Sequence, residues 1–243
     1  MFSSIANFRL RSVLVPVLSL GVVLCLLRPL ERQRFESEER ATLPRGLGGN
    51  GLLGILGGMR AAVAGGLWLR TNQAWEKQDA AETMALLNLT VATDDRPLYF
   101  WLNGARMLAY DIPTWTVRPG EPEAIRRKAV RSGVAAADAF LESALRVHPR
   151  SPEILIEMAN IQLRAGENPE LAARLFRRAA EQPGAPYFAA RIHGELLREL
   201  GRTEEALAWL KKILPDLPAD DPAAARTLIE QRIKSLEAVR KEK

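Results

Sequence analysis

Two helix-pair patterns lie between Ser151 and Pro218 in nearly the same phase, and this repetition limits the possible folds more than any other feature. Three apolar positions recur after 34 residues and one glycine after 35: Ala172 with Ala206, Phe176 with Leu210, Ala179 with Ile213, and Gly166 with Gly201. In stacked helix pairs, small residues let backbones approach closely, larger ones fill the space between helices, and glycine or proline ends a helix. We therefore predict an all-α solenoid of antiparallel helix pairs.

Weaker versions of the pattern lie on both sides of these two pairs. A first pair is predicted from helices at 52–77 and 80–93, and the next pair begins with a helix at 98–111. The segment 222–243 is amphipathic and predicts the capping helix that covers the end of a solenoid core. The predicted solenoid therefore spans residues 52–243.

An insertion at residues 112–131 separates the two helices of the second pair. It contains three prolines and the basic run Arg126-Arg127-Lys128-Arg131. An insertion between paired helices maps to a surface loop or to an extension of the second helix, and repeat proteins often place specificity there. Alternatively, the basic run is a solvated helix face, as charge runs usually are.

The segment from Ser12 to Leu27 is free of charge and has arginines on both sides. A span normally needs about 20 residues, but flanking arginines can reach outward to the interface. A cleaved signal peptide is one alternative, although no small-x-small cleavage site precedes the charged run that follows. A buried helix of a soluble protein is another. We predict an uncleaved transmembrane anchor in residues 1–30 and a polar, glycine-rich linker in residues 31–51.

Two orientation rules disagree for this anchor. More arginines follow the segment than precede it, which would keep the solenoid in the cytoplasm. A short basic N-terminus ahead of a first apolar segment more commonly stays inside while the following chain is exported. We expect the solenoid on the periplasmic side.

The net charge of +5 is concentrated near the N-terminus. Residues 1–45 carry a balance of +3, which leaves +2 for the other 198 residues. Phosphate binding needs a concentrated basic face, so we do not expect nucleic acid as a partner. Cys25 is the only cysteine, which excludes an intramolecular disulfide.

The sequence offers no catalytic or metal-binding constellation. Nucleophilic catalysis needs a positioned base, and the only histidines are His148 and His193. Neither has a cysteine or a second histidine at the spacing of metal ligands. We therefore predict no enzymatic activity, no metal, no cofactor and no small-molecule substrate.

Small residues recur at every fourth position of the first predicted helix: Gly54, Gly58, Ala62 and Gly66. Another helix could pack closely on this stripe, in lipid or in water. A second membrane span would place Arg60 near the bilayer centre at a cost of about 2.5 to 3.5 kcal/mol. We prefer a helix that packs on the repeats or lies at the membrane surface. The stripe supports an alternative function, in which the chain is a structural subunit of a membrane complex.

The repeats resemble tetratricopeptide repeats, with two clear units in 151–218, weaker ones at about 61–97 and 98–150, and a terminal half-repeat from Pro222. The chain departs from that pattern because the first helices of the clear units lack the usual Trp and Tyr. The stretches GGMRAAVAGGLWLR and FWLNGARMLAY also resemble a group of membrane-anchored bacterial tetratricopeptide proteins that lack an assigned activity. That resemblance implies a single-pass protein of the bacterial inner membrane.

In tetratricopeptide domains the first helix of each pair lines a concave groove that holds a peptide. Carried over by phase, the resemblance implies a partner-binding groove lined by Tyr99, Arg106, Tyr110, Asn160, Arg164, Arg191, Glu195, Arg198 and Arg232. An asparagine with several guanidinium groups suits a carboxylate, although exposed arginine is also the ordinary state of this residue. The predicted function is a membrane-anchored scaffold or adaptor for a protein or peptide partner with an acidic or carboxylate group.

Overall fold

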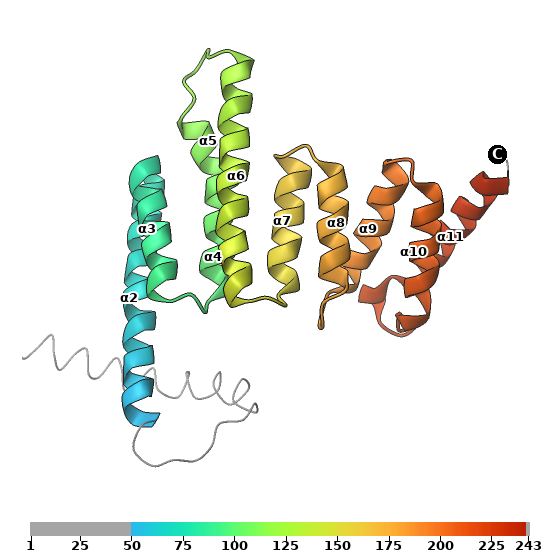
Figure 1. Cartoon of the computed structure of the whole chain (residues 1–243), viewed down its shortest axis with the longest axis horizontal. Coiled ribbons are helices and arrows are strands. Elements are labelled where there is room, and N and C mark those ends of the chain that lie inside the picture. The colour runs from blue at the N-terminus through green and yellow to red at the C-terminus, as the bar shows by residue number, and fades with distance from the viewer. Residues whose placement is uncertain (1–49, 242–243) are drawn as a thin grey trace, which may run out of the picture. The chain divides into compact units, whose positions relative to one another are not determined.

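The computed structural model describes residues 50–241, with the side chains of residues 57–238 and of Arg240. Within this range every regular element is helical (Figure 1). The elements are α2 (Asn50–Glu76), α3 (Ala80–Thr93), α4 (Leu98–Arg106), the π-helical turn η1 (Met107–Asp111), α5 (Ile112–Trp115), α6 (Glu123–Val147), α7 (Pro152–Arg164), α8 (Pro169–Ala180), α9 (Tyr187–Glu199), α10 (Thr203–Ile213), the 3₁₀ turns η2 (Leu214–Asp216) and η3 (Pro222–Ala224), and α11 (Arg226–Lys241). The predicted anchor from Ser12 to Leu27 and most of the predicted linker lie outside the described residues.

Residues from Ile55 onward belong to one unit, in which consecutive helices pair and stack. Helix α8 lies between α7 and α9, and α10 lies between α9 and α11. The pair α2–α3 is antiparallel, because Arg60 near the start of α2 donates to the carbonyl of Thr93 at the end of α3. The prediction of stacked helix pairs is confirmed for the described part of the chain.

Local sequence explains where the helices of the clear repeats begin. Ser151 and Asn168 accept hydrogen bonds from backbone N–H groups three residues later, and each is followed by proline at the first helical position. Such a residue satisfies a donor that the helix itself leaves free, and proline loses nothing there. The left-handed residues that follow α7 and α9 are Glu167 (φ 49°) and Gly201 (φ 74°), which are 34 residues apart. The backbone conformation therefore keeps the 34-residue spacing, whereas the glycines Gly166 and Gly201 are 35 residues apart.

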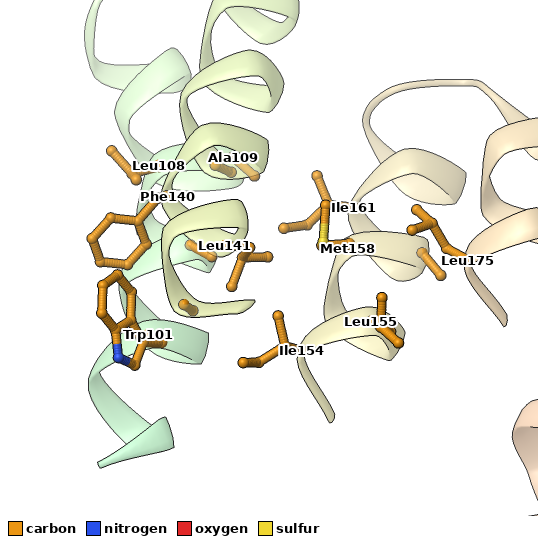
Figure 2. Close-up of a cluster of buried hydrophobic side chains, with 14 of the residues drawn as sticks. Trp101, Leu108, Ala109, Phe140, Leu141, Ile154, Leu155, Met158, Ile161 and Leu175 are labelled. Carbon is orange, nitrogen blue, oxygen red and sulfur yellow. The ribbon is translucent and has the colours of Figure 1, made fainter. Parts of the chain in front are cut away.

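One continuous core runs from α2 to α9, and a second connects α9, α10 and α11. Figure 2 shows Trp101 of α4 beside Phe140 of α6, and, beyond Leu141, side chains of α7 such as Met158. The ring centroids of Trp101 and Phe140 lie 4.8 Å apart. Ala172 and Ala206, the predicted small positions of the clear repeats, are fully buried.

The second pair differs from the prediction of an insertion at 112–131. Its first helix continues through η1 to the end of α5, and its second helix, α6, already begins at Glu123. Only residues 116–122 form a loop, and the basic run lies on the first turns of α6. The insertion is therefore mainly an extension of both helices, which project beyond α3 and α7 (Figure 1).

The C-terminal helix also starts later than predicted. Pro222 begins a 3₁₀ turn, Ala225 is left-handed (φ 47°), and α11 starts at Arg226. The Arg226 guanidinium donates to the carbonyl oxygens of Leu214 and Leu217, which connects α11 to the η2 turn after α10.

None of the helices within residues 50–241 combines the length and the hydropathy that crossing a membrane requires. The 27-residue helix α2 is one of them, so the structure does not support a second membrane span at this position.

Candidate functional site

The predicted groove residues lie on the first helices of the pairs, which are α4 with η1, α7, α9 and α11. We call the surface that carries them the first-helix face. The structure gathers most of these residues into two separate clusters, one where α4 and η1 face α7 and one between α9 and α11.

The first cluster is centred on an ion pair between Arg106 and Glu157. The guanidinium donates from Nε to Oε1 at 2.9 Å and from Nη2 to Oε2 at 2.6 Å. Glu157 is only 5% exposed, and its hydrogen bonds raise the pKa of Arg106 above the ordinary value. Because this guanidinium already holds a carboxylate of the chain itself, it is not a free cation for a ligand.

Tyr110 and Arg164 complete the first cluster. Burial raises the pKa of Tyr110, the negative charge of Glu157 adds to this, and Arg164 and Arg106 oppose it. Arg164 is exposed and forms no hydrogen bond or salt bridge with the residues that the structure describes. It is the cation of this cluster that remains open to a partner.

Two predicted groove residues stand outside both clusters. Tyr99 packs edge-on against Trp68 of α2, with ring centroids 5.2 Å apart, and thus belongs to the junction of the first two pairs. Asn160 is half-buried on α7, and within the described range its side chain has no hydrogen-bond partner.

The second cluster places three guanidinium groups around Glu195. Arg198 donates to its Oε1 from Nε at 3.0 Å and from Nη2 at 2.6 Å. Arg232 reaches across from α11, with Nε 3.1 Å from Oε2. The hydrogen bonds from Arg198 lower the pKa of Glu195 most, and the charges of Arg232, Arg198 and Arg191 lower it further. We call these four residues the Glu195 cluster.

Arg191 is the unpaired member of the Glu195 cluster. It is half-buried and forms no hydrogen bond or salt bridge with any described residue. A cavity of about 190 Å³ lies beside it, lined by Arg191, Glu195, Leu210, Leu228, Ile229 and Arg232. Leu228 is 45% exposed at this cavity. The cluster therefore offers a cation next to apolar side chains, which is suited to a carboxylate beside an aliphatic group.

Sequence reasoning missed Glu157, Leu228 and Ile229. Glu157 falls between Ile154 and Ile161 on the buried side of α7. A carboxylate within an apolar helix face signals that a partner must come from elsewhere in the fold. The signal does not identify that partner, since Arg106 lies 51 residues away.

Both histidines are held by backbone carbonyls. His148 Nε2 lies 3.0 Å from the oxygen of Asp95, and His193 Nδ1 lies 2.8 Å from that of Ala173. Burial lowers the pKa of His193. Across the described residues, no group of three or more His, Cys, Asp or Glu side chains is placed to hold a metal ion.

The small-residue stripe of α2 faces outward. Gly58, Ala62 and Gly66 are exposed, and a Cβ built at Gly58 or Gly66 would meet no atom within 4 Å. Gly54 lies in the part of α2 whose side chains the structure does not describe. Close packing within residues 57–238 therefore does not explain these small residues.

Comparisons with known proteins give little beyond this geometry. No family model matches the chain, and no curated protein matches it. Among solved structures, it is similar to a thermophilic TPR protein of Thermus thermophilus, with 19% identity, a TM-score of 0.41, and coverage of 71% of this chain and 80% of that one. The description of the fold as helix pairs therefore depends on the contacts given above.

Proposed function

We propose that the chain is a membrane-anchored scaffold that binds a protein or peptide partner through the first-helix face. The observation that carries this proposal is the Glu195 cluster, in which Arg191 forms no hydrogen bond or salt bridge with a described residue and borders a cavity that three apolar side chains also line. A partner segment with a carboxylate and an aliphatic side chain matches both features, because guanidinium and carboxylate form paired hydrogen bonds and the cavity removes apolar surface from water.

The anchor in this proposal is the uncharged segment from Ser12 to Leu27. Its support is the composition of that segment and the arginines on both sides. A single span there would hold the solenoid at a bacterial inner membrane, on the periplasmic side. Carbonate extraction and protease protection of the full chain test these two points, since a peripheral protein is extracted and a cytoplasmic solenoid is cleaved only after lysis.

The partner is tested by placing a photo-cross-linking residue at Leu228 of the full chain in its native membrane. We expect a discrete cross-linked protein that Arg191→Ala reduces about tenfold, because a hydrogen bond to a charged group contributes about 1.5 to 3 kcal/mol. Arg178→Ala is the matched control, since Arg178 is exposed on α8 and forms no side-chain ion pair with any described residue. A product of equal yield in both variants would reject the role of the Glu195 cluster.

A synthetic pair of peptides tests the carboxylate directly. A peptide that ends in leucine with a free carboxylate should compete with the cross-link, whereas the same peptide with a C-terminal amide should not. Equal competition by both would show that the cavity selects an apolar side chain without reading the charge.

A further inference from the structure

Two neighbouring cavities lie along α6, one against η1, α5 and the loop that follows α5, and the other against α3, α4 and η1. Their volumes are about 360 and 370 Å³, and both are lined by Met84, Leu108 and Ala136. The two cavities therefore adjoin at these residues, and we call their combined surface the apolar groove. None of the predicted partner-binding residues lines it.

Apolar side chains dominate the lining of this groove. The end nearest the tip of α6 is formed by Leu108, Met84, Ile112, Pro113, Val117 and Ile125, and the other end by Val91, Trp101 and Phe140. Met84 is 38% exposed and Ile125 is 44% exposed. Solvent therefore reaches apolar side chains that a ligand could remove from water.

Small residues on α6 and a close helix contact shape the groove. Ala129, Ala136 and Ala139 face it from α6 and leave space that larger side chains would fill. At Gly133 a Cβ would collide with the side chain of Pro113 and with the carbonyl oxygen of Leu108, which is part of η1. The π-helical turn thus brings its backbone directly against α6, and π turns inside helices occur frequently at functional sites.

A single cation lies among the described residues that line the groove. Lys128 makes no hydrogen bond or salt bridge with any of the residues described, and the same holds for its neighbours Arg127 and Arg131. Arg126 is already paired with Glu123. The tip of α6 therefore adds unpaired positive charge to one end of an apolar groove, which complements an anionic group.

We propose that the apolar groove binds a single-chain amphiphile with an anionic headgroup, of which a fatty acid is the simplest example. The acyl chain lies over Leu108 and Ala136, and the headgroup lies at Lys128. The lining favours an acyl chain with one charged end, because a single cation among the described residues, Lys128, lies at one end of a largely apolar surface. Each cavity is in the range of small-molecule sites, roughly 300 to 1,000 Å³.

The test uses the full chain in lipid vesicles with palmitate that carries a diazirine in its acyl chain. After illumination, mass spectrometry should find the label on groove residues such as Met84 and Ile125. Labelling confined to other parts of the chain would overturn the proposal. A probe of the same chain length with a trimethylammonium headgroup should label the groove several times less, and equal labelling would also overturn it.

Matched variants locate the site. Ala139→Trp places a large ring in the groove and should reduce labelling at least fivefold, whereas Ala208→Trp is its control at the equivalent exposed position of α10. Lys128→Glu should reduce labelling roughly threefold, as expected for an exposed charge contact. Labelling that survives Ala139→Trp overturns the proposal, provided that circular dichroism shows an unchanged fold.

Two further outcomes separate this proposal from its rivals. Arg191→Ala should leave the labelling unchanged, so failure of the first-helix face and failure of the apolar groove are distinguishable. A photo-cross-linking residue at Met84 that captures a protein, together with absent palmitate labelling, would show that a partner helix occupies the groove and would overturn the amphiphile.

Discussion

The second pair, residues 98–147, and the fourth pair, residues 187–213, share equivalent buried positions but expose different kinds of side chain. Their second helices correspond at a spacing of 69 residues, so that Leu141 of α6 matches Leu210 of α10, and both are buried. Each of these helices borders a cavity next to the preceding second helix. The corresponding cavity between α3 and α6, which Ala139, Phe140 and Ser143 line, is mostly apolar, whereas the one between α8 and α10 is basic.

The basic cavity has a volume of about 310 Å³ and contains Arg174, Arg177 and Lys212. Trp209 forms part of its wall and is held by a hydrogen bond from its Nε1 to the carbonyl of Ala190 at 2.8 Å and by an edge-on contact with His193. The position that is Lys212 in α10 is Ser143 in α6. The repeat thus fixes where the cavities lie, and the exposed positions of the second helices decide what each can bind.

The first-helix face also differs between the two pairs, in whether an arginine is already paired with a carboxylate. In the second pair Arg106 forms an ion pair with the buried Glu157, while in the fourth pair Arg191 forms no ion pair with any described residue. The comparison predicts that one arginine stabilises the fold and the other serves binding.

Replacement of each arginine by alanine tests that difference. Arg106→Ala should lower the free energy of unfolding by about 2 kcal/mol, because it leaves the buried Glu157 without its partner; the value is below that of a fully buried pair because the Arg106 side chain is half exposed. Arg191→Ala should change it by less than about 0.5 kcal/mol. Urea unfolding at pH 7 measures both, and equal losses would remove the distinction. Adding Glu157→Gln to Arg106→Ala should restore part of the loss.

A second comparison uses two of the tightly packed glycines, one in each pair. Gly133→Ala should cost about 1 to 2 kcal/mol, because the new methyl group would press on the backbone carbonyl of Leu108 as well as on Pro113. Gly194→Ala meets the flexible end of Leu210 at 2.7 Å. Side-chain adjustment there and the better helix propensity of alanine should leave stability nearly unchanged. Thermal unfolding of both variants measures the two losses of stability. A larger loss for Gly194→Ala would contradict the expectation that the contact of Gly133 with the backbone of η1 is the more rigid of the two.

The smallest expected effect is the dependence of stability on pH, for which Asp138 in the second pair and His193 in the fourth pair contribute slopes of opposite sign. Asp138 on α6 accepts a hydrogen bond from Gln162, but burial raises its pKa to about 6. The folded state therefore keeps a proton that the unfolded state releases near pH 4, so this group lowers stability as pH rises from about 4 to about 6. Asp138→Asn should increase stability by about 1 kcal/mol at pH 7 and have no effect near pH 4.

His193 supplies the opposite slope. Burial lowers its pKa, so the unfolded state binds the proton more readily, and stability is lost as pH falls below the ordinary histidine range. His193→Gln, which retains a donor for the carbonyl of Ala173, should reduce that loss. Urea unfolding between pH 4.5 and 7.5 measures both variants, and slopes of the same sign would contradict this assignment.

The regular part of the fold was predictable from sequence because its signals are local. The caps at Ser151 and Asn168 and the recurring apolar positions of α7 to α10 depend on residues within a few turns of one another. The Glu195 cluster follows from the same regularity, since Arg191, Glu195 and Arg198 share one face of α9 and Arg232 occupies a similar phase in α11.

The irregular part was not predictable in the same way. The π-helical turn packs against Gly133, and Arg106 pairs with Glu157; both contacts join residues that are distant in sequence. A π turn has no strong local signature, and here it is accommodated by the absence of a side chain at Gly133, on the opposite helix.

The sequence by itself therefore determined that the described part of this protein is a stack of helix pairs, with a 34-residue repeat between α7–α8 and α9–α10, because helix periodicity and capping are short-range properties. Only the tertiary structure decided which arginine forms an ion pair with a buried carboxylate. It also decided that the cavity between α3 and α6 is mostly apolar and the one between α8 and α10 basic. Those outcomes depend on side chains that meet across helices, where burial removes water and makes each pairing exclusive.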